Sequence, residues 1–512
     1  MAQLSSLVAI SNLRSDSRVL VKSMLVIGSA QFVNILITIV RMKVFANLLG
    51  PSGVGLLSIY TSFQGMVQET AGLGMVSSGV REITSSRGDE ATLSRVRRVL
   101  FAAHLIHGAL AMLAVWLLRE RIAIWLFGDA VRSTEIGLIG IAIFLSLLVS
   151  AQTALLQGLR KIGYLGRVTV IGAFVGTLAG LAAVWLQGES GLIWFILVQP
   201  MAAVVIALHY TRRLPRPTAI RPTLVETWEV WKPMAKLGTA FMLGGLAHAA
   251  TLLLVRGRIS QELGLDAAGH FAAAWGITMT YVGFLLTAMG TDYYPRLVEV
   301  IHDKVSAVQL MNDQAQLVLA IGGPVLLLMI GLAPWVITVL YSDEFGPAVK
   351  LLQWQTVGNL FIVASWAIGF SIIASARGKT FLLFQVNFNI LFLLMLWPTL
   401  ASFGIVAAGP AFTIAYIMHF TLLYLIVRRI FQFRLQPLSL ALLAIHTSLA
   451  FALLGATQFL PEFSAFASVF LAVATGVFGV RVVLSKIGMH GSLPIRLYEI
   501  FERFGWPIQT LV

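Results

Sequence analysis

The feature that most constrains the fold of this chain is a succession of long apolar runs that contain few or no charged residues. A helix needs about 20 such residues to cross the hydrocarbon core of a bilayer, and only a complete helix satisfies its own backbone hydrogen bonds in lipid. Apolar residues make up 58% of the chain and charged residues only 11%, which excludes an ordinary soluble domain. The sequence therefore predicts an all-α polytopic membrane protein.

The apolar runs predict fourteen transmembrane helices. We place them at residues 21–45, 54–80, 99–118, 136–158, 165–187, 191–210, 234–257, 268–290, 316–341, 351–375, 380–398, 404–427, 438–456 and 464–484. An even number of crossings puts both termini on one side of the membrane. Cytoplasmic termini collect 28 of the 36 Lys and Arg residues in cytoplasmic loops, as the positive-inside rule requires. Anionic lipid beside these loops accounts for the net charge of +14, so no nucleic-acid partner is expected.

The two halves of the chain contain similar motifs at a nearly constant offset in the numbering, which indicates an internal repeat. The matched pairs are Val40-Arg41 with Val255-Arg256, Leu49-Gly50 with Leu263-Gly264, Arg81 with Arg296, Phe127-Gly128-Asp129 with Tyr341-Ser342-Asp343, and Leu155–Arg160 with Ile372–Arg377. Each repeat contains six predicted helices, so we expect two lobes of one orientation, related by a pseudo-two-fold axis along the membrane normal.

The repeat divides the chain into four predicted segments. They are an N-lobe of helices 1–6 at residues 1–214, a cytoplasmic linker with an interfacial helix at 215–233, a C-lobe of helices 7–12 at 234–434, and two further helices with a cytoplasmic tail at 435–512. The linker combines proline and arginine with Trp228 and Trp231, and tryptophan is typical of a membrane interface.

A continuous polar stripe runs along the first predicted helix and ends on a cation. Gln31, Asn34, Thr38 and Arg41 follow one another at steps of three and four residues, so they share one face of the helix. Lys43 adds a second cation two residues further on. We interpret this face as one side of a binding pocket.

The seventh predicted helix carries a comparable stripe. It contains His248 and Thr251 and ends near Arg256 and Arg258. The sequence alignment pairs Arg41 with Arg256, whereas the register of the stripe pairs it with Arg258, and both pairings stay open. We interpret these cations as the second side of one basic pocket. Cations this close to a helix end commonly extend to the lipid headgroups, and that alternative also stays open.

Few acidic residues lie deep in the predicted helices. Glu69 lies near the centre of the second helix and Asp292 at the inner end of the eighth, so we interpret them as candidates for ion coupling or for ion pairs with the arginines. Arg81 and Arg296, which the repeat relates, are expected at the cytoplasmic end of the pathway as gate residues. A purely structural ion pair is the alternative for Glu69.

Arginines in a membrane-embedded pocket favour an anionic ligand, because the planar guanidinium binds phosphate or carboxylate through two parallel hydrogen bonds. The chain has no cysteine, and no cluster of metal ligands, catalytic triad or phosphate-binding loop stands out in the sequence. We therefore expect a transporter rather than an enzyme, with no catalytic residues, no metal and no cofactor.

Two regions of the chain carry a family resemblance. The first comprises Arg41–Lys43, Leu49-Gly50-Pro51-Ser52-Gly53-Val54-Gly55, Ala71-Gly72-Leu73-Gly74 and Val80-Arg81-Glu82, and the second comprises Asp343-Glu344-Phe345, Leu352-Gln353-Trp354-Gln355, Gly358 and Gly369-Phe370. Together they resemble Wzx-type flippases, the O-antigen and enterobacterial-common-antigen translocases of the multidrug/oligosaccharidyl-lipid/polysaccharide (MOP) exporter superfamily, over residues 20–430.

The resemblance implies a two-lobe flippase of the bacterial inner membrane. Such a protein moves an undecaprenyl-diphosphate-linked oligosaccharide across the membrane by alternating access, for surface polysaccharide biosynthesis. The diphosphate would bind between Arg41 and Arg256 or Arg258, and the further partners would be membrane lipids and a polysaccharide polymerase complex. The last two predicted helices depart from the usual twelve of that family.

Two other classes of protein stay open. A MATE-like exporter of small cations would carry several buried acids in each lobe, whereas here only Glu69 is deep. A membrane-embedded glycan polymerase would carry a large external loop with catalytic residues, whereas the predicted external loops are short.

Overall fold

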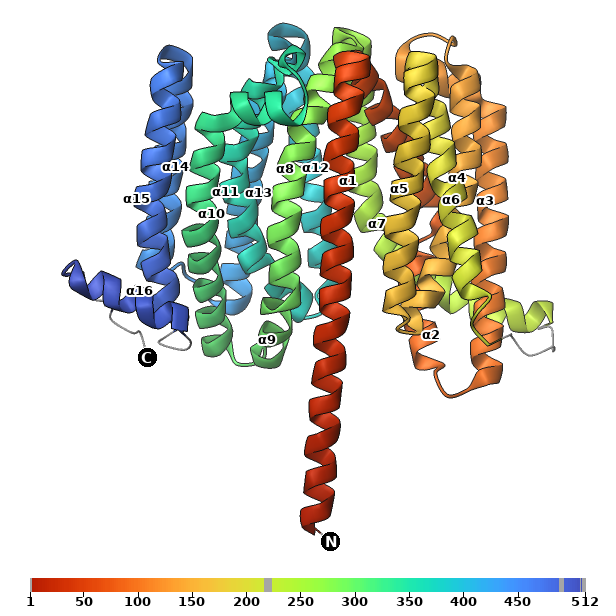
Figure 1. The fold of residues 1–512 in the computed structure, drawn as a ribbon, viewed down its shortest axis with the longest axis horizontal. Coiled ribbons are helices and arrows are strands. Elements are labelled where there is room, and N and C mark those ends of the chain that lie inside the picture. Colours follow the sequence, from red (N-terminus) through yellow and green to blue (C-terminus); the bar gives the residue numbers. More distant parts are fainter. Residues whose placement is uncertain (1, 216–222, 488–491, 507, 509–512) are drawn as a thin grey trace. The chain divides into compact units, whose positions relative to one another are not determined.

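The chain folds entirely into helices in the part that the structure describes. The computed structural model describes residues 2–215, 223–487, 492–506 and 508, with side chains from Ser29 onward except at 240, 288, 291, 487, 492 and 493. Every regular element in these ranges is an α-helix or a short 3-10 helix, so the predicted all-α class is confirmed. Contacts divide the chain into two compact units, Met1–Ala268 and Gly269–Val512. Figure 1 follows the helices in chain order.

The first unit consists of long helices joined by short loops. Its elements are α1 (Ala2–Gly72), α2 (Met75–Ser85), α3 (Glu90–Phe127), α4 (Ser133–Gly158), α5 (Ile162–Gln187), η1 (Gly188–Ser190), α6 (Gly191–Thr211) and α7 (Leu224–Leu263).

The second unit has the same character. Its elements are α8 (Leu265–Thr291), α9 (Tyr293–Val300), α10 (Lys304–Leu340), η2 (Asp343–Phe345), α11 (Ala348–Ala374), α12 (Gly378–Phe403), η3 (Gly404–Ala407), α13 (Ala408–Phe431), α14 (Pro437–Phe459), α15 (Pro461–Ile487) and α16 (Ser492–Arg503).

Long apolar helices dominate both units. Among the described residues, nine helical stretches are long and apolar enough to cross a membrane, or ten if the bent pair Leu224–Thr239 and Phe241–Leu263, which meet at 48°, counts as one span. Three of the nine have 44, 50 and 54 residues, about twice the length of one crossing. These three contain breaks at Gly50, η1 and η3 respectively. Helices lie over all the predicted spans, the multi-pass prediction is confirmed, and the count of fourteen crossings stays a prediction.

A break in the backbone at Gly50 divides α1 into two halves. Gly50 adopts φ 64° and ψ −166°, a conformation open to glycine because it has no Cβ. Pro51 begins the second half, where the missing N–H leaves no helical hydrogen bond unmade. Figure 1 shows the chain turning at this point. The break therefore separates the first two predicted spans.

Local backbone structure recurs in the two halves of the sequence at a constant offset in the numbering. Gly50 and Gly264 both interrupt a helix with positive φ, 64° and 88°. At the same offset, Asp89 and Asp303 both cap the next long helix, and each carboxylate accepts a hydrogen bond of 3.0 Å from the backbone N–H two residues further on. The duplication predicted from the sequence is therefore present in the local structure of both halves.

The offset of the repeat grows by two positions at the turns that follow α4 and α11. Lys161 N–H donates to Leu156 O at 2.8 Å, and Arg377 N–H donates to Ile372 O at 3.1 Å. The predicted match of Leu155 with Ile372 is therefore wrong by one position, because the hydrogen bonds of the turn, rather than similar letters, fix the register. Positive φ recurs with the same offset, at Arg160 and Ala376 and at Gly188 and Gly404.

The glycine breaks also fix which residues of α1 and α7 correspond. At the offset between Gly50 and Gly264, Arg41 corresponds to Val255, whose side chain is buried. Arg256 and Arg258 lie one and three positions beyond that residue. Neither predicted pairing with Arg41 therefore agrees with the register that the two glycines set. Successive helical residues are rotated by about 100° around the axis, so both arginines leave α7 in directions different from the one equivalent to Arg41.

The helix α7 packs within the first unit. It contacts α1, α2 and α3. Its backbone approaches the α1–α2 junction so closely that a Cβ placed on Gly238 would lie 2.2 Å from Leu73 O. Contacts thus group α7 with the helices before it, whereas the repeat starts a new lobe at residue 234. The four-segment division stays a prediction.

The start of α7 includes the part of the linker that was expected to be a short helix. Thr223 and Glu226 form a reciprocal capping box there. Trp228 and Trp231 stack on the first turns with their ring centres 5.0 Å apart. The proline-rich residues 216–222 lie outside the described residues.

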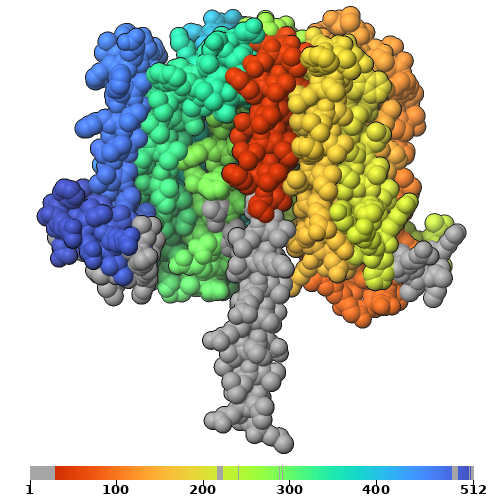
Figure 2. Space-filling view, in the orientation of Figure 1, coloured from red at the N-terminus to blue at the C-terminus, as the bar shows by residue number. Residues whose placement is uncertain are grey.

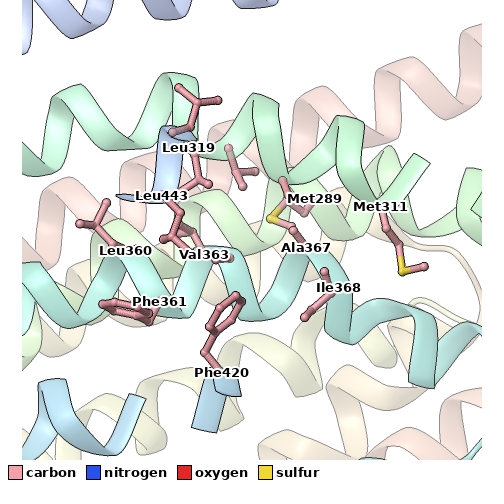
Figure 3. Packing of buried hydrophobic residues seen from close by; sticks show 14 of the residues in the cluster. Met289, Met311, Leu319, Leu360, Phe361, Val363, Ala367, Ile368, Phe420 and Leu443 are labelled. Carbon is pink, nitrogen blue, oxygen red and sulfur yellow. The ribbon is translucent and has the colours of Figure 1, made fainter. Parts of the chain in front are cut away.

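An apolar cluster forms the core of the second unit. Figure 3 shows how α10 and α11 interdigitate in it, and the labelled side chains include Leu319, Leu360, Val363 and Ala367. Phe420 of α13 and Leu443 of α14 complete the cluster. Because lipid is itself apolar, close packing of this kind, rather than removal from water, holds membrane helices together.

The two helices without a repeat partner, α14 and α15, pack directly on α10. A Cβ on Gly323 of α10 would lie 2.3 Å from the ring of His446, and one on Gly331 would lie 2.0 Å from Ser468 Oγ. Lys486 of α15 pairs with Asp313 of α10 at 2.5 Å. Glycine in α10 therefore allows α14 and α15 to join the core of the second unit.

Candidate functional site

A polar cavity of about 490 Å³ lies inside the first unit, between α1, α4, α5 and α6. Figure 2 shows the side chains of α1 from Ser29 onward against those of α5, and the contacts of the two helices agree. The polar residues that line the cavity are Asn34, Arg41, Thr61, Gln64, Gln68, Ser146, Ser150, Thr153, Thr169 and Gln199. Such a lining offers hydrogen bonds on several sides of a ligand.

Helical periodicity places the glutamines of this cavity on one face. Gln64 and Gln68 lie on the second half of α1, one turn apart, and each donates to a serine of α4. The distances are 3.1 Å from Gln64 Nε2 to Ser146 Oγ and 3.4 Å from Gln68 Nε2 to Ser150 Oγ. The two stripes thus hold each other in place and keep further donors and acceptors directed at the cavity.

Hydroxyl groups on the same wall are satisfied by their own helices. Ser150 Oγ donates to Ser146 O at 3.0 Å, and Thr153 Oγ1 donates to Val149 O at 3.0 Å. Thr61 Oγ1 donates to Leu57 O at 2.9 Å. Each hydroxyl therefore keeps lone pairs that can accept a hydrogen bond from a ligand.

Arg41 supplies the positive charge of the cavity, and no carboxylate is among the residues that line it. Its guanidinium lies 4.8 Å from the ring centre of Phe195, which in turn packs edge-on against Phe45 at 5.3 Å. A cation over an aromatic face is stabilised without losing its capacity to bind an anion. Arg41 Nε is buried without a hydrogen-bond partner, and none of the ion pairs among the described residues includes Arg41.

Arg256 is held on a different face of α1. Its Nη1 donates to Ser58 O at 3.0 Å and also to Ser62 Oγ. Ser58 and Ser62 are one turn apart, and their side chains are buried against α7. Arg256 is not among the residues that line the cavity. The second half of α1 therefore has two adjacent polar faces, one toward the cavity and one toward α7.

Four further predicted binding residues, Arg258, His248, Lys43 and Gln31, do not line this cavity. Arg258 pairs with Glu262 one turn further along α7, and His248 is exposed. Lys43 is partly exposed and Gln31 is exposed on α1. The convergence of Arg256 or Arg258 with Arg41 on one ligand stays a prediction.

Of the predicted stripe on the first helix, the structure brings two members to the cavity. Asn34 and Arg41 line it, two turns apart. Thr38 lies between them, and its hydroxyl donates to Asn34 O at 2.8 Å. The stripe is thus present, but it faces a cavity formed within one unit.

Glu69 lies on the α7-facing side of α1. A Cβ placed on Gly245 would lie 2.6 Å from Glu69 Oε1, so the carboxylate rests against this glycine. No ion pair or hydrogen bond among the described residues involves the Glu69 carboxylate. Its coupling role stays a prediction.

The predicted gate residues lie on the surface. Asp292 and Arg296 pair with each other at 3.3 Å and are largely exposed. Arg81 on α2 is exposed. The gate roles of Arg81 and Arg296 and the coupling role of Asp292 stay predictions.

Most of the cavity wall was missed in the sequence. Thr61, Gln64 and Gln68 follow each other at steps of three and four residues, the same signal that revealed the first stripe. Ser146, Ser150 and Thr153 on the fourth run do so too, although serine and threonine in membrane helices often satisfy only their own backbone.

The second unit has large apolar side chains at several of the equivalent positions, although Gln64 corresponds to Thr278 and Thr169 to Gln385. At the offsets of the repeat, Thr61 corresponds to Trp275, Ser146 to Ile362 and Ser150 to Trp366. Trp275 is 4% exposed and stacks on Phe271 and Phe392 at 5.5 and 6.2 Å. At these three positions the second unit does not repeat the polar lining of the first.

Solved structures of membrane transporters share this arrangement of helices. The lipid II flippase MurJ in an inward closed conformation has a TM-score of 0.67 and 12% identity, covering 89% of this chain and 98% of its own. An inward-facing multidrug resistance MATE family transporter of the MOP superfamily has a TM-score of 0.64 and 15% identity, covering 77% of this chain and 95% of its own. At these identities the likeness shows the fold alone.

Residues 44–350 match the family described as polysaccharide biosynthesis protein, and the chain belongs to this family. Among curated relatives, the lipid III flippase of Escherichia coli K12 is 23% identical over 391 residues, covering 74% of this chain and 91% of the relative. The lipid III flippase of Shigella flexneri matches to the same extent. The resemblance to polysaccharide flippases of the MOP superfamily is thus confirmed for family and fold.

Proposed function

We propose that this protein is a flippase that moves a lipid-linked oligosaccharide across the bacterial inner membrane by alternating access, for surface polysaccharide biosynthesis. Membership of the polysaccharide biosynthesis family supports this function, as do relatives named lipid III flippase and a structural neighbour named lipid II flippase. The observation that carries the proposal is the cavity in the first unit, where Arg41 has no counter-ion among neutral hydrogen-bonding groups.

The chemistry of the cavity matches the two polar parts of such a substrate. Arg41 binds a phosphate of the undecaprenyl diphosphate, because a guanidinium offers paired donors to phosphate oxygens. The amides of Gln64, Gln68 and Gln199 and the hydroxyls of α4 bind sugar hydroxyls, which both donate and accept. The lipid tail stays in the bilayer.

The remaining candidate residues have roles in other steps of the cycle. Arg256, which is bonded to Ser58 and Ser62 here, transfers to the diphosphate when the cargo is loaded, and Arg258 is the alternative donor. Lys43 adds positive charge at the same end of α1. Glu69 couples transport to an ion gradient by taking up a proton.

Gate and partner assignments complete the proposal. Arg81 and Arg296, the latter paired with Asp292, act at the cytoplasmic end, and both termini lie in the cytoplasm. A polysaccharide polymerase complex receives the translocated product.

The charge of the cavity also discriminates against the MATE-like alternative. An exporter of organic cations would present a carboxylate to its cargo, whereas the residues that line this cavity include one arginine and no acid. We therefore expect vesicles that contain the protein to move a lipid diphosphate and to leave organic cations in place.

The experiment that tests the function measures the translocation of a fluorescent lipid-diphosphate oligosaccharide in liposomes containing the purified chain, with and without a proton gradient. Arg41→Gln removes charged hydrogen bonds and should weaken cargo binding roughly tenfold to a hundredfold. Arg41→Lys keeps the charge but not the paired donors, so it should retain partial activity.

A matched control comes from α3. Arg119 stacks on Trp116 at 4.7 Å, nearly the geometry of Arg41 on Phe195, but lies outside the cavity. Arg119→Gln should transport at the wild-type rate. Wild-type transport by Arg41→Gln at equal protein level, or transport of organic cations by the wild type, would contradict the proposed function.

A further inference from the structure

A second cavity of the first unit, of about 250 Å³, lies between α3, α4 and α6 and has three arginines in its wall. Arg97 and Arg98 lie near the start of α3, and Arg212 follows the end of α6. Gln152 of α4 adds an amide. No residue of this cavity lines the one that contains Arg41, so the two are separate sites.

Backbone carbonyl groups hold the side chain of Arg97 in place. Arg97 Nη1 donates to Pro215 O at 2.9 Å, and its Nη2 donates to Thr211 O at 3.4 Å. These carbonyls lie at and just beyond the C-terminal end of α6. None of the described residues that line the cavity is acidic, and the ion pairs between described residues include neither Arg97 nor Arg212. An anion would find positive charge there without an acidic competitor.

Apart from Gln152, the wall deeper in the helices is apolar. Leu100 and Phe101 follow the two arginines of α3 by about one turn, and Leu208 precedes the end of α6 by about one turn. Phe101 is 37% exposed and lies in a stretch that is apolar enough to cross a membrane. The cavity is therefore basic at the ends of the helices and apolar toward their middle, which is the order of headgroup and chain in a phospholipid.

We propose that this cavity binds the phosphate of an anionic phospholipid, with the lipid chains along Phe101 and Leu208. Basic pockets between transmembrane helices attract such headgroups, because helix ends and headgroups lie at the same depth. The positive-inside rule puts this end of α3 in the cytoplasm, so the bound lipid comes from the inner leaflet. The site is distinct from the cargo pathway and makes no use of the proposed function.

The test compares lipids on the purified full-length chain in detergent. Phosphatidylglycerol and phosphatidylcholine with identical acyl chains are titrated, and bound lipid is counted by native mass spectrometry while the melting temperature is followed. We expect phosphatidylglycerol to bind more tightly and to raise the melting temperature, because it carries a net negative charge and phosphatidylcholine does not. Inorganic phosphate alone, in a third titration, should give a smaller rise since it lacks the apolar contacts.

The variant for this test is the double substitution Arg98→Gln with Arg212→Gln, which leaves Arg97 bonded to the end of α6. Each lost cation should weaken binding about fivefold, so the double variant should bind phosphatidylglycerol about thirtyfold more weakly. Arg428→Gln with Arg429→Gln removes the same charge from the end of α13 and should bind as the wild type does.

Three results would overturn the proposal. Equal binding of the two lipids by the wild type would do so even if the variants fail to fold. Unchanged binding by the Arg98/Arg212 variant would show that the lipid binds elsewhere. A rise in melting temperature with inorganic phosphate equal to that with phosphatidylglycerol would overturn the assignment to a lipid.

Discussion

The contact between α7 and the α1–α2 junction gives a prediction that compares two glycines of one helix. Gly238 and Gly245 lie two turns apart on α7, but a Cβ would meet different kinds of atoms. At Gly238 it would lie 2.2 Å from Leu73 O and 3.0 Å from Gly74 C, which are backbone atoms. At Gly245 it would lie 2.6 Å from Glu69 Oε1, the end of a flexible side chain.

The magnitudes follow from what has to move. Alanine stabilises a helix by roughly 0.5–1 kcal/mol relative to glycine, and both variants gain this equally. In Gly245→Ala, a change of the Glu69 rotamer costs about 0.5–1.5 kcal/mol, so the net effect on stability should be within about 1 kcal/mol of zero. In Gly238→Ala, a helix must shift, which costs about 3 kcal/mol or more. We therefore expect the two variants to differ by at least about 2 kcal/mol.

The measurement is thermal unfolding of both purified variants in the same detergent and lipid. For a chain of 512 residues that unfolds as one unit, a difference of about 2 kcal/mol corresponds to a gap in melting temperature of about 2 °C. Because the two substitutions are chemically identical and on the same helix, the gap isolates the backbone clash. Equal melting temperatures for the two variants would refute the close approach of Gly238 to the α1–α2 junction.

Three further predictions concern the cavity, the docking of α15 and the helix caps. Phe195→Leu removes the ring beneath Arg41 and should weaken cargo binding about fivefold in the liposome assay; because this ring is buried against Phe45, the melting temperature should also fall. Asp313→Asn leaves Lys486 without its partner at 2.5 Å and should lower the melting temperature, whereas adding Lys486→Met should recover part of the loss. Hydrogen bonds from the Thr92 hydroxyl and backbone lower the pKa of Asp89 below its ordinary value of 3.8, and those from Ser306 and Val305 lower the pKa of Asp303 likewise. A lowered folded-state pKa stabilises the protein above the unfolded value and loses that effect as pH falls through the folded one, so the destabilisation by Asp89→Asn should be full at pH 7 and fade below pH 3.8.

The positions of the helices were predictable from the sequence, because apolar runs longer than one crossing have few alternatives in lipid. The duplication was also predictable, because Gly50 and Gly264 mark breaks in the helices that other residues would not tolerate. The register between the repeats was not predictable from the sequence. An alignment shifted by one residue is almost as similar in sequence, yet it rotates the equivalent positions of a helix by about 100°.

The orientation of each helix toward its neighbours was the part of the site that the sequence could not predict. Ser58 and Thr61 are three residues apart, yet Ser58 faces α7 and accepts from Arg256, whereas Thr61 lines the cavity. Arg41 and Asn34 were found because they lie on the same polar stripe of the first predicted helix. Arg256 was paired with Arg41 by letter similarity, which carries no information about the direction of a side chain. Only the packing of α7 against α1 reveals that direction.

The unequal interiors of the two units imply unequal rules for sequence change. Where Thr61 and Ser146 line a polar cavity, an altered side chain is tolerable if it still offers a donor or an acceptor, whatever its bulk. Trp275 and Ile362 occupy the matching positions in the second unit. There the side chains are closely packed, so adding or removing even one methylene group disturbs the packing of their neighbours. Homologous segments of one ancestral duplication would thus drift under opposite constraints, polarity in the earlier copy and volume in the later one.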